Sequence, residues 1–245
     1  FILAAGKGTR LMPLTKNTPK SLLELGDGTT LLERQISNAV QSKLFSEIVI
    51  LTGYKHEQID AKVKEYKEEI KISTIYNPFF DTTNNLVSLW LANHLMLESD
   101  FVITNGDNIY KDHVYREVLD GLPQELIQVT IDYKTTFDDD DMKVVLQEDS
   151  TIVKIHKEIP LEDADAESVG LAVVKGAKSR RLFSQKLVEM VKDTENMGIY
   201  WLVIFNSLVH DGIIVNTKEI AETDWQEMDF HPDIESLRKI VFKEF

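Results

Sequence analysis

The segment Leu3-Ala4-Ala5-Gly6-Lys7-Gly8-Thr9-Arg10, near the start of a 245-residue chain, decides the fold. The apolar residues 1–4 are typical of a buried strand, and the two glycines follow them closely. Glycine lacks a Cβ atom, so such a loop can approach an anion and direct its N–H groups at it. Lys7, Arg10 and Lys20 add positive charge, which predicts a polyphosphate pocket. A strand-to-loop connection with incidental surface cations explains the spacing equally well.

Strands and helices alternate through the first half of the chain. Some segments carry apolar residues at helical spacing, and short β-branched runs typical of buried strands lie between them. The predicted strands are 1–4, 47–52, 71–76 and 101–104, and the predicted helices are 31–41, 54–66 and 86–97. Strands separated by helices of this length indicate βαβ units on a parallel sheet. The pattern therefore predicts a three-layer α/β fold.

The second half of the chain is less regular. The predicted strands are 126–133, 143–146, 151–156 and 169–174, and the predicted helices are 179–192 and 234–241. The sequence contains no internal repeat and no obvious flexible linker. We therefore expect a single domain over 1–245, in which a phosphate-binding half, 1–110, precedes a second half, 111–245.

Composition excludes several classes of protein. The 41 acidic and 27 basic residues give a net charge of -14, which argues against binding to a nucleic-acid backbone. The absence of cysteine excludes disulfides, thiolate metal sites and cysteine nucleophiles. No apolar run approaches the roughly 20 residues that a membrane span needs. We expect a cytoplasmic protein without a membrane partner, and the sequence leaves a homo-oligomeric state open.

A second candidate site lies at the end of the predicted strand 101–104. There Asn105-Gly106-Asp107 places a carboxylate at the carboxyl end of a buried strand, where open α/β sheets bind their ligands. Carboxylate oxygen suits Mg²⁺, which takes one or two such ligands together with substrate phosphates. An ordinary exposed turn aspartate is the alternative interpretation.

These motifs together resemble the signature of nucleotidyltransferases that activate sugar phosphates, LAAGxGxR followed by PK. The resemblance implies a Rossmann-like αβα fold with a mixed, mostly parallel sheet, and transfer of a nucleotide with release of pyrophosphate. It implies catalytic roles for Arg10 and Lys20 and a metal-binding role for Asp107. It also implies a second Mg²⁺ ligand, Asp229, in the late stretch 225–233. The implied nucleotide-binding residues are Leu3, Ala4, Ala5, Gly6, Lys7, Gly8, Thr9, Lys20, Gly53 and Gly106.

The stretch 81–92 indicates a branch of that family. Its sequence, Asp-Thr-Thr-Asn-Asn-Leu-Val-Ser-Leu-Trp-Leu-Ala, resembles small bacterial cytidylyltransferases that act on phosphocholine or 2-aminoethylphosphonate. The resemblance implies CTP as the nucleotide, with Asn85 and Ser88 in its binding site. Helix capping alone is the simpler interpretation for one of the two asparagines, Asn84 and Asn85.

The second half, 111–245, is expected to bind the acceptor. The acidic run 138–141 and Glu167 favour a cationic head group. A quaternary ammonium also seeks aromatic faces, for which Tyr200, Trp201 and Trp225 are candidates. Lys143 favours a phosphate or phosphonate, so an acceptor with both charges reconciles the signs. The family resemblance further implies Lys157 as a ligand of the acceptor phosphate. A solvated hairpin tip is the alternative for the acidic run. At the level of function, a sugar-1-phosphate nucleotidyltransferase using another nucleotide and a catalytically silent regulatory subunit remain as alternatives.

Overall fold

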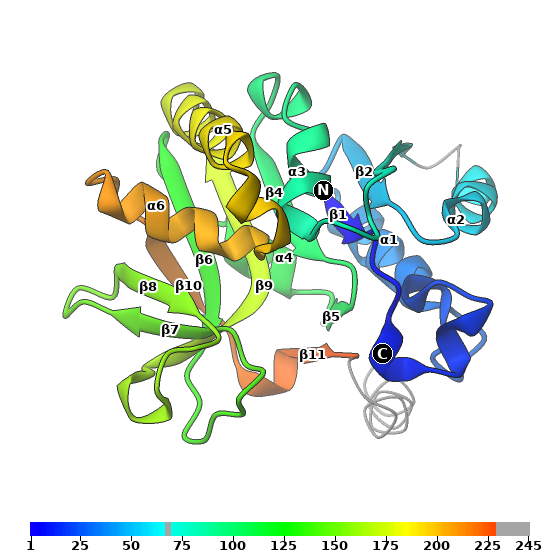
Figure 1. Cartoon of the computed structure of the whole chain (residues 1–245), viewed down its shortest axis with the longest axis horizontal. Helices are drawn as coiled ribbons and strands as arrows, with labels where there is room; N and C mark the ends of the chain where they lie inside the picture. Colours follow the sequence, from blue (N-terminus) through cyan, green and yellow to red (C-terminus); the bar gives the residue numbers. More distant parts are fainter. Residues whose placement is uncertain (67–69, 229–245) are drawn as a thin grey trace. The chain divides into compact units, whose positions relative to one another are not determined.

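The computed structural model describes residues 1–66 and 70–228. The chain forms two compact units that are discontinuous in sequence (Figure 1). Within the described residues, unit 1 comprises Phe1–Asp81, Asn105–Glu117 and 223–228, and unit 2 comprises Thr82–Thr104 and Val118–Glu222. The division therefore does not follow the predicted halves 1–110 and 111–245. A single domain over 1–245 stays a prediction.

Unit 1 contains a parallel three-stranded sheet and a small antiparallel ribbon. In the sheet, β2 lies between β1 and β3, and in the ribbon β5 pairs with β11. The strands are β1 (Ile2–Ala4), β2 (Glu47–Thr52), β3 (Lys71–Tyr76), β5 (Asn108–Tyr110) and β11 (Trp225–Glu227). The helices are α1 (Leu31–Ser42) and α2 (His56–Val63), and α4 (Val114–Leu119) begins in this unit. The 3₁₀ turns are η1 (Thr9–Leu11), η2 (Leu14–Lys16), η3 (Lys20–Leu22) and η4 (Lys64–Tyr66), and η9 (Glu222–Asp224) leads into β11.

The local sequence explains these elements. Five of the six residues of β2 are buried, as expected for the central strand of a parallel sheet covered on both faces. Helix α1 begins with a capping box, in which Thr30 and Glu33 each satisfy the other's backbone N–H. Such a cap is worth about 1 kcal/mol because it pairs donors that a helix start otherwise leaves unsatisfied.

An apolar cluster fixes the start of α1 to the β5–β11 ribbon. Its fully or almost fully buried members are Leu11, Leu25, Leu31, Ile109 and Met228. Because they come from η1, a loop, α1, β5 and the residue after β11, burying them together holds distant parts of the sequence in one unit.

Unit 2 is built on a mixed sheet with the strand order β10-β6-β9-β4. Strand β10 pairs with β6 in parallel, whereas β9 is antiparallel to both β6 and β4. The hairpin β7–β8 joins through antiparallel pairing of β7 with β9. The strands are β4 (Phe101–Asn105), β6 (Leu126–Asp132), β7 (Lys143–Leu146), β8 (Ile152–His156), β9 (Ala166–Lys175) and β10 (Asn216–Glu219). The helices are α3 (Asn85–Leu91), α5 (Ala177–Lys192) and α6 (Ile204–His210), and the 3₁₀ turns are η5 (Leu95–Leu97), η6 (Leu161–Asp163), η7 (Thr194–Gly198) and η8 (Trp201–Val203).

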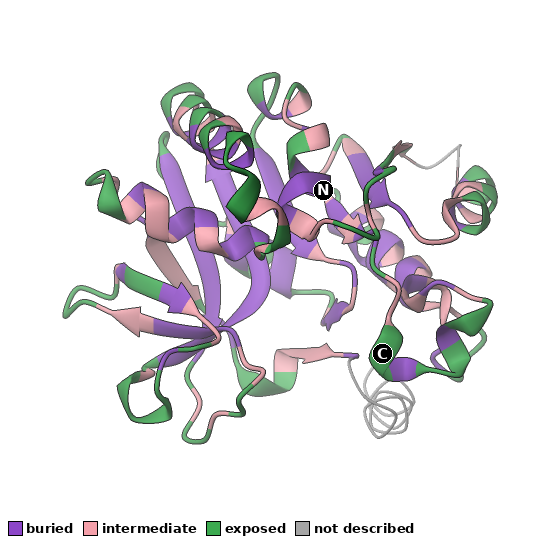
Figure 2. Cartoon of the chain, in the orientation of Figure 1, coloured by how far each residue is buried: buried purple, intermediate pink, exposed green. Residues whose placement is uncertain are grey.

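The core of unit 2 lies between its sheet and its helices. Every residue of β6 and nine of the ten residues of β9 are buried, as the continuous purple of these strands shows in Figure 2. Helix α5 packs on β9 and on α6, with Phe183 contacting both Phe101 and Phe205 edge to face or tilted. Its outward face is exposed (Figure 2).

The Rossmann-like α/β class with a mixed sheet is confirmed. Each strand predicted in 47–52, 71–76, 101–104 and 143–146 is present within one residue of its expected bounds. Sequence patterns missed the short elements β5, β10, β11, α4 and α6. The predicted helix 234–241 lies outside the described residues. None of the helices in the described part of the chain is both long and apolar enough to cross a membrane.

Candidate active site

The glycine-rich loop in unit 1 leaves β1 and folds back against η3. Gly8 adopts a left-handed conformation, with φ 60° and ψ 44°, and its carbonyl accepts hydrogen bonds from Leu11 N and Thr15 Oγ1. A Cβ atom on Gly8 would lie 2.9 Å from Lys20 Cβ, so only glycine lets the loop pack this closely on Lys20. The two parts of the sequence signature are therefore in contact.

Lys20 forms an ion pair with the predicted metal ligand. Its Nζ lies 3.0 Å from Asp107 Oδ2, and the side chains are 14% and 28% exposed respectively. A partly buried pair interacts more strongly than a surface pair because solvent screens it less. The geometry brings a fixed cation and a hard oxygen ligand to the same point beside the glycine loop. Gly6, in the same loop, has open space where a Cβ atom would project.

Asp107 is held by the backbone on both sides. The N–H of Gly106 donates to the Leu3 carbonyl at 3.0 Å, and a Cβ atom on Gly106 would lie 2.4 Å from that oxygen. The carbonyl of Asp107 accepts from Met228 N at 2.9 Å. The turn that carries the carboxylate is thus fixed to β1 and to the residue after β11.

Gln35 of α1 adds a support that sequence reasoning missed. Its buried Nε2 donates to the carbonyls of Asn105, at 2.8 Å, and Asn108, at 2.6 Å, which flank the Gly106–Asp107 turn. The available signal was a glutamine on the same helix face as Leu32 and Ile36, where an apolar residue is expected. A polar residue on such a face must find a partner, and here the partners are the carbonyls of this turn.

The other residues of unit 1 predicted to bind nucleotide lie in a strand, in an ion pair, in tight packing or on the surface. Gly53 packs against Ala5 and Phe80, and its Cβ would lie 2.6 Å from the Ala5 carbonyl oxygen, so its glycine requirement is explained by packing. Lys7 pairs with the exposed Asp81. Leu3 and Ala4 are residues of β1, and Thr9 and Arg10 are exposed on η1.

Asn85 and Ser88, the residues of unit 2 predicted to bind nucleotide, lie in the first turn of α3, which follows Asn84. Asn85 Oδ1 accepts from Trp201 N at 2.8 Å, and Asn84 Oδ1 caps α3 by accepting from Asn85 N at 2.7 Å. Asn84 also joins the segment before η8, since its Nδ2 donates to the Gly198 carbonyl at 3.1 Å. Ser88 is buried in α3. These contacts tie α3 to 197–201, so a role for Asn85 or Ser88 in nucleotide binding stays a prediction.

The predicted acceptor residues Lys143, Lys157 and Glu167 converge on the acidic turn 138–141. Lys143 is 1% exposed, and its Nζ donates to the carbonyls of Asp138, at 3.1 Å, and Asp139, at 3.2 Å. This ammonium orders the turn through backbone contacts. Binding of an acceptor phosphate by Lys143 would require it to exchange those partners.

Lys157 connects the same turn to an exposed aromatic ring. Its Nζ lies 3.1 Å from Asp140 Oδ1 and 4.9 Å from the centre of the Tyr200 ring. Of the predicted aromatic residues, Tyr200 is 38% exposed, whereas Trp201 is 1% exposed and packs edge to face on Phe205. Tyr200 is therefore the more accessible of these two rings, and the ammonium of Lys157 lies over it.

Glu167 is buried and paired with Lys134, which also contacts Asp141 at 3.3 Å. Burial raises the pKa of the Glu167 carboxyl to about 7, against the opposing effect of the Lys134 ammonium. Burial by itself would lower the pKa of Lys134, but its hydrogen bond and charge interaction with Glu167 raise it. Glu167 therefore gains and loses a proton near neutral pH within a network that reaches the acidic turn.

The structure thus places two groups of predicted residues, one in each unit. Unit 1 holds the glycine loop, Lys20 and Asp107, and unit 2 holds Lys143, Lys157 and Glu167 around the turn 138–141. The predicted second metal ligand, Asp229, lies outside the described residues. A glycine loop, a fixed lysine and a strand-end carboxylate define unit 1 as a candidate site for a metal-bound polyphosphate.

Comparison with known proteins identifies the family to which the chain belongs. The model of the family described as "Nucleotidyl transferase" matches residues 1–236, and the chain belongs to that family. The solved structure of CTP:phosphocholine cytidylyltransferase from Streptococcus pneumoniae has a TM-score of 0.76 to this chain at 23% identity. It covers 98% of this chain and 97% of that one. At this identity the match supports the shared fold.

Several curated relatives are similar over part or most of the chain. The bifunctional protein GlmU of Methanococcus aeolicus is 37% identical over 136 residues, which are 56% of this chain and 31% of that protein. Choline-phosphate cytidylyltransferase of Streptococcus pneumoniae is 34% identical over 119 residues, 49% of this chain and 48% of that protein. 2-Aminoethylphosphonate cytidylyltransferase of Lancefieldella rimae is 26% identical over 230 residues, 91% of this chain and 87% of that protein. The match to GlmU thus spans about a third of that protein, and the match to choline-phosphate cytidylyltransferase spans about half of that protein.

Proposed function

We propose that this chain is a Mg²⁺-dependent cytidylyltransferase. It would join CTP to a small phosphorylated amine or alcohol, or to a phosphonate, and give a CMP-activated product and pyrophosphate. An oxygen of the acceptor phosphate or phosphonate forms a bond to the α-phosphorus of CTP. The bond from that phosphorus to the bridging oxygen breaks, and pyrophosphate leaves with the electron pair.

The contact between Lys20 and Asp107 beside the glycine loop is the observation that carries this proposal. Attack of one phosphate on another brings anions together, so catalysis consists mainly of positioning and charge neutralisation. Lys20 supplies a compact positive charge, held in place by packing against Gly8. Its role is to offset charge on the phosphates as pyrophosphate departs, and no covalent nucleophile is needed.

The carboxylate of Asp107 fits a divalent cation. It is partly exposed at the end of β4, it already attracts one cationic group, and it offers the oxygen ligand that Mg²⁺ prefers. When bound, Mg²⁺ would neutralise phosphate charge. We assign Asp107 and Asp229 as its protein ligands. The assignment of Asp229 rests only on the family motif in the sequence.

The choice of CTP and of the acceptor class rests on similarity and on unit 2. Two of the relatives described above are cytidylyltransferases, one named for choline phosphate and one for 2-aminoethylphosphonate. Around the turn 138–141, carboxylates lie beside Lys157 and the exposed ring of Tyr200. Such a mixture of charges and an aromatic face suits an acceptor that carries both an ammonium and a phosphorus oxyanion.

Substitution of Lys20 tests the proposal. We expect Lys20→Gln to lower kcat by about 10²–10³-fold, as removal of one preorganised charge-stabilising donor does in other enzymes. Lys16→Gln is the matched control, because Lys16 lies four residues away on η2 and is exposed. Pyrophosphate release is measured with CTP, Mg²⁺ and phosphocholine or 2-aminoethylphosphonate, and melting curves establish that both variants fold. Equal turnover in the folded Lys20→Gln variant and in wild type would refute the role of Lys20.

A further inference from the structure

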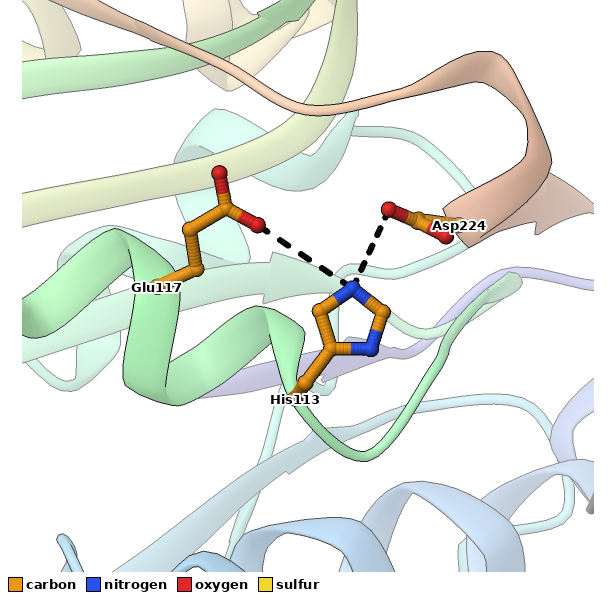
Figure 3. A group of neighbouring side chains, drawn as sticks. All are labelled: His113, Glu117 and Asp224. Atoms are coloured by element: carbon orange, nitrogen blue, oxygen red, sulfur yellow. Dashed lines mark hydrogen bonds and ion pairs between the residues drawn. The ribbon is translucent and has the colours of Figure 1, made fainter.

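The geometry points to a second metal site in unit 1, formed by His113, Glu117 and Asp224 and suited to a divalent transition metal such as Zn²⁺. The three side chains each offer one ligand atom, and these atoms all lie within 4.8 Å of one another. In Figure 3 the His113 ring points between the two carboxylates. This inference does not depend on nucleotidyl transfer, since none of the three residues belongs to the candidate active site.

Two of the three ligand separations are close to those that a tetrahedral ion needs. His113 Nε2 lies 3.1 Å from Asp224 Oδ2 and 4.0 Å from Glu117 Oε2. Zinc binds imidazole nitrogen and carboxylate oxygen at about 2.0–2.2 Å, so tetrahedral angles place two such ligands about 3.3–3.5 Å apart. Rotamer adjustments of less than about 1 Å would therefore bring the His113–Glu117 separation to that value.

The backbone places two of the ligand residues, His113 and Glu117, on the same side of the first turn of α4. His113 precedes α4 immediately, and Glu117 follows it by four positions, one helical turn later. The third ligand comes from a distant part of the sequence, since Asp224 ends η9 just before β11. The carbonyl of Asp224 accepts from Lys111 N at 2.9 Å, and the Lys111 ammonium lies 3.5 Å from Asp224 Oδ1. The other carboxylate oxygen, Oδ2, is the one that faces His113.

The chemistry of this set discriminates between metals. An imidazole nitrogen with two carboxylates is a donor set of zinc sites, whereas Mg²⁺ prefers oxygen ligands alone. His113 and Glu117 are exposed, which leaves room for a water in the fourth position, as in zinc sites with three protein ligands. The set therefore differs in kind from the oxygen ligand proposed at Asp107.

A metal here would fasten the β5–β11 ribbon. Strand β11 follows Asp224 directly and pairs with β5, and Met228 after it donates to the Asp107 carbonyl. Binding of an ion to the folded form alone stabilises it by mass action. At a free Zn²⁺ concentration of about 100 times Kd, the expected rise in melting temperature is about 5–11 °C for a chain of this size.

Zinc titration of metal-stripped protein tests the site. Calorimetry and melting curves are recorded with Zn²⁺ in excess Mg²⁺, so that oxygen-only sites are occupied. We expect wild type to bind one Zn²⁺ equivalent, and His113→Gln and Glu117→Gln to bind it at least about tenfold more weakly, because loss of even an outer-shell partner costs about 10–100-fold at other metal sites. His210→Gln is the matched control, because His210 is exposed beside the carboxylate of Asp211 but belongs to no group of three such ligands among the residues that the structure describes.

The outcomes separate the alternatives. Weakened Zn²⁺ affinity in His113→Gln and Glu117→Gln, with wild-type affinity in His210→Gln, supports the site. Equal Zn²⁺ affinity in wild type and His113→Gln would overturn it and leave a hydrogen-bonded His113–Asp224 pair. Equal weakening in His210→Gln would also overturn it, because binding would then reflect surface histidines in general. All variants are compared with wild type by melting in chelator, which detects any loss of folding that is independent of metal.

Discussion

Two glycines in unit 1, Gly6 and Gly106, are predicted to respond in opposite ways to alanine. Both belong to the predicted nucleotide site. A Cβ atom on Gly106 would lie 2.4 Å from the Leu3 carbonyl oxygen and 2.9 Å from the Leu3 carbonyl carbon. Ordinary contacts between heavy atoms are about 3.5 Å or more, so the backbone of β1 or of the Asp107 turn must move by roughly 1 Å. At Gly6 no atom lies within 4 Å of the added Cβ.

The magnitudes follow from these contacts. Overpacking of this kind costs about 1–3 kcal/mol, which lowers the melting temperature of a chain of this size by about 2–12 °C. Gly6 does not require a positive φ, so Gly6→Ala restricts the unfolded chain without strain and stabilises by about 0.4–1 kcal/mol. In the proposed nucleotide site, the same Cβ would take space that we assign to a phosphate. We therefore expect Gly6→Ala to raise the Kd for CTP by about tenfold or more, equivalent to about 1.4 kcal/mol.

Melting curves and calorimetric CTP titrations of both variants are the assay. The expected pattern is lower stability for Gly106→Ala, and unchanged or higher stability with weakened CTP binding for Gly6→Ala. Wild-type CTP affinity in Gly6→Ala would refute the assignment of the loop to the phosphates. A wild-type melting temperature in Gly106→Ala would refute the packing argument at the Asp107 turn.

Two further predictions concern buried polar groups. Gln35→Ala should lower the unfolding free energy by about 1–3 kcal/mol, because the partly buried carbonyl of Asn105 and the buried carbonyl of Asn108 lose their side-chain donor. Denaturant titration measures this change, and an unchanged midpoint would contradict it. Burial raises the pKa of Glu167 from 4.5 to about 7. Between these two pH values the folded protein therefore binds more protons than the unfolded chain, and the stability of wild type falls as the pH rises. In Glu167→Gln that contribution is absent, and stability measured from pH 4.5 to 7 should fall less steeply with pH; an equal slope in both proteins would contradict the raised pKa of Glu167.

Much of the fold could be predicted from local sequence. The run 47–52 is rich in β-branched residues and forms β2, and the helical spacing around Leu32 and Ile36 forms α1. The short strands β5 and β11 were missed because three residues carry too little pattern to be recognised. Their pairing depends on contacts between segments more than 110 residues apart in the chain.

The candidate site could be predicted where backbone chemistry requires a residue type. Gly8 and Lys20 are adjacent in the structure because only glycine permits their packing, and the sequence signature contains both. Lys143 shows the limit of such reasoning. A lysine beside an acidic run is compatible with binding a ligand or with ordering the run, and the structure has its ammonium on the backbone carbonyls of the turn. Only tertiary contacts distinguish these uses.

Pyrophosphate release with Mg²⁺ tests the proposed cytidylyltransferase activity, measured for CTP, UTP, GTP and dTTP against phosphocholine, 2-aminoethylphosphonate, phosphoethanolamine and glucose 1-phosphate. We expect release with CTP and an acceptor that carries both an amine and a phosphorus oxyanion. Release with glucose 1-phosphate and another nucleotide would retain the roles of Lys20 and Asp107 but contradict the proposed acceptor. Binding of CTP without release for any acceptor would contradict the proposed cytidylyltransferase activity.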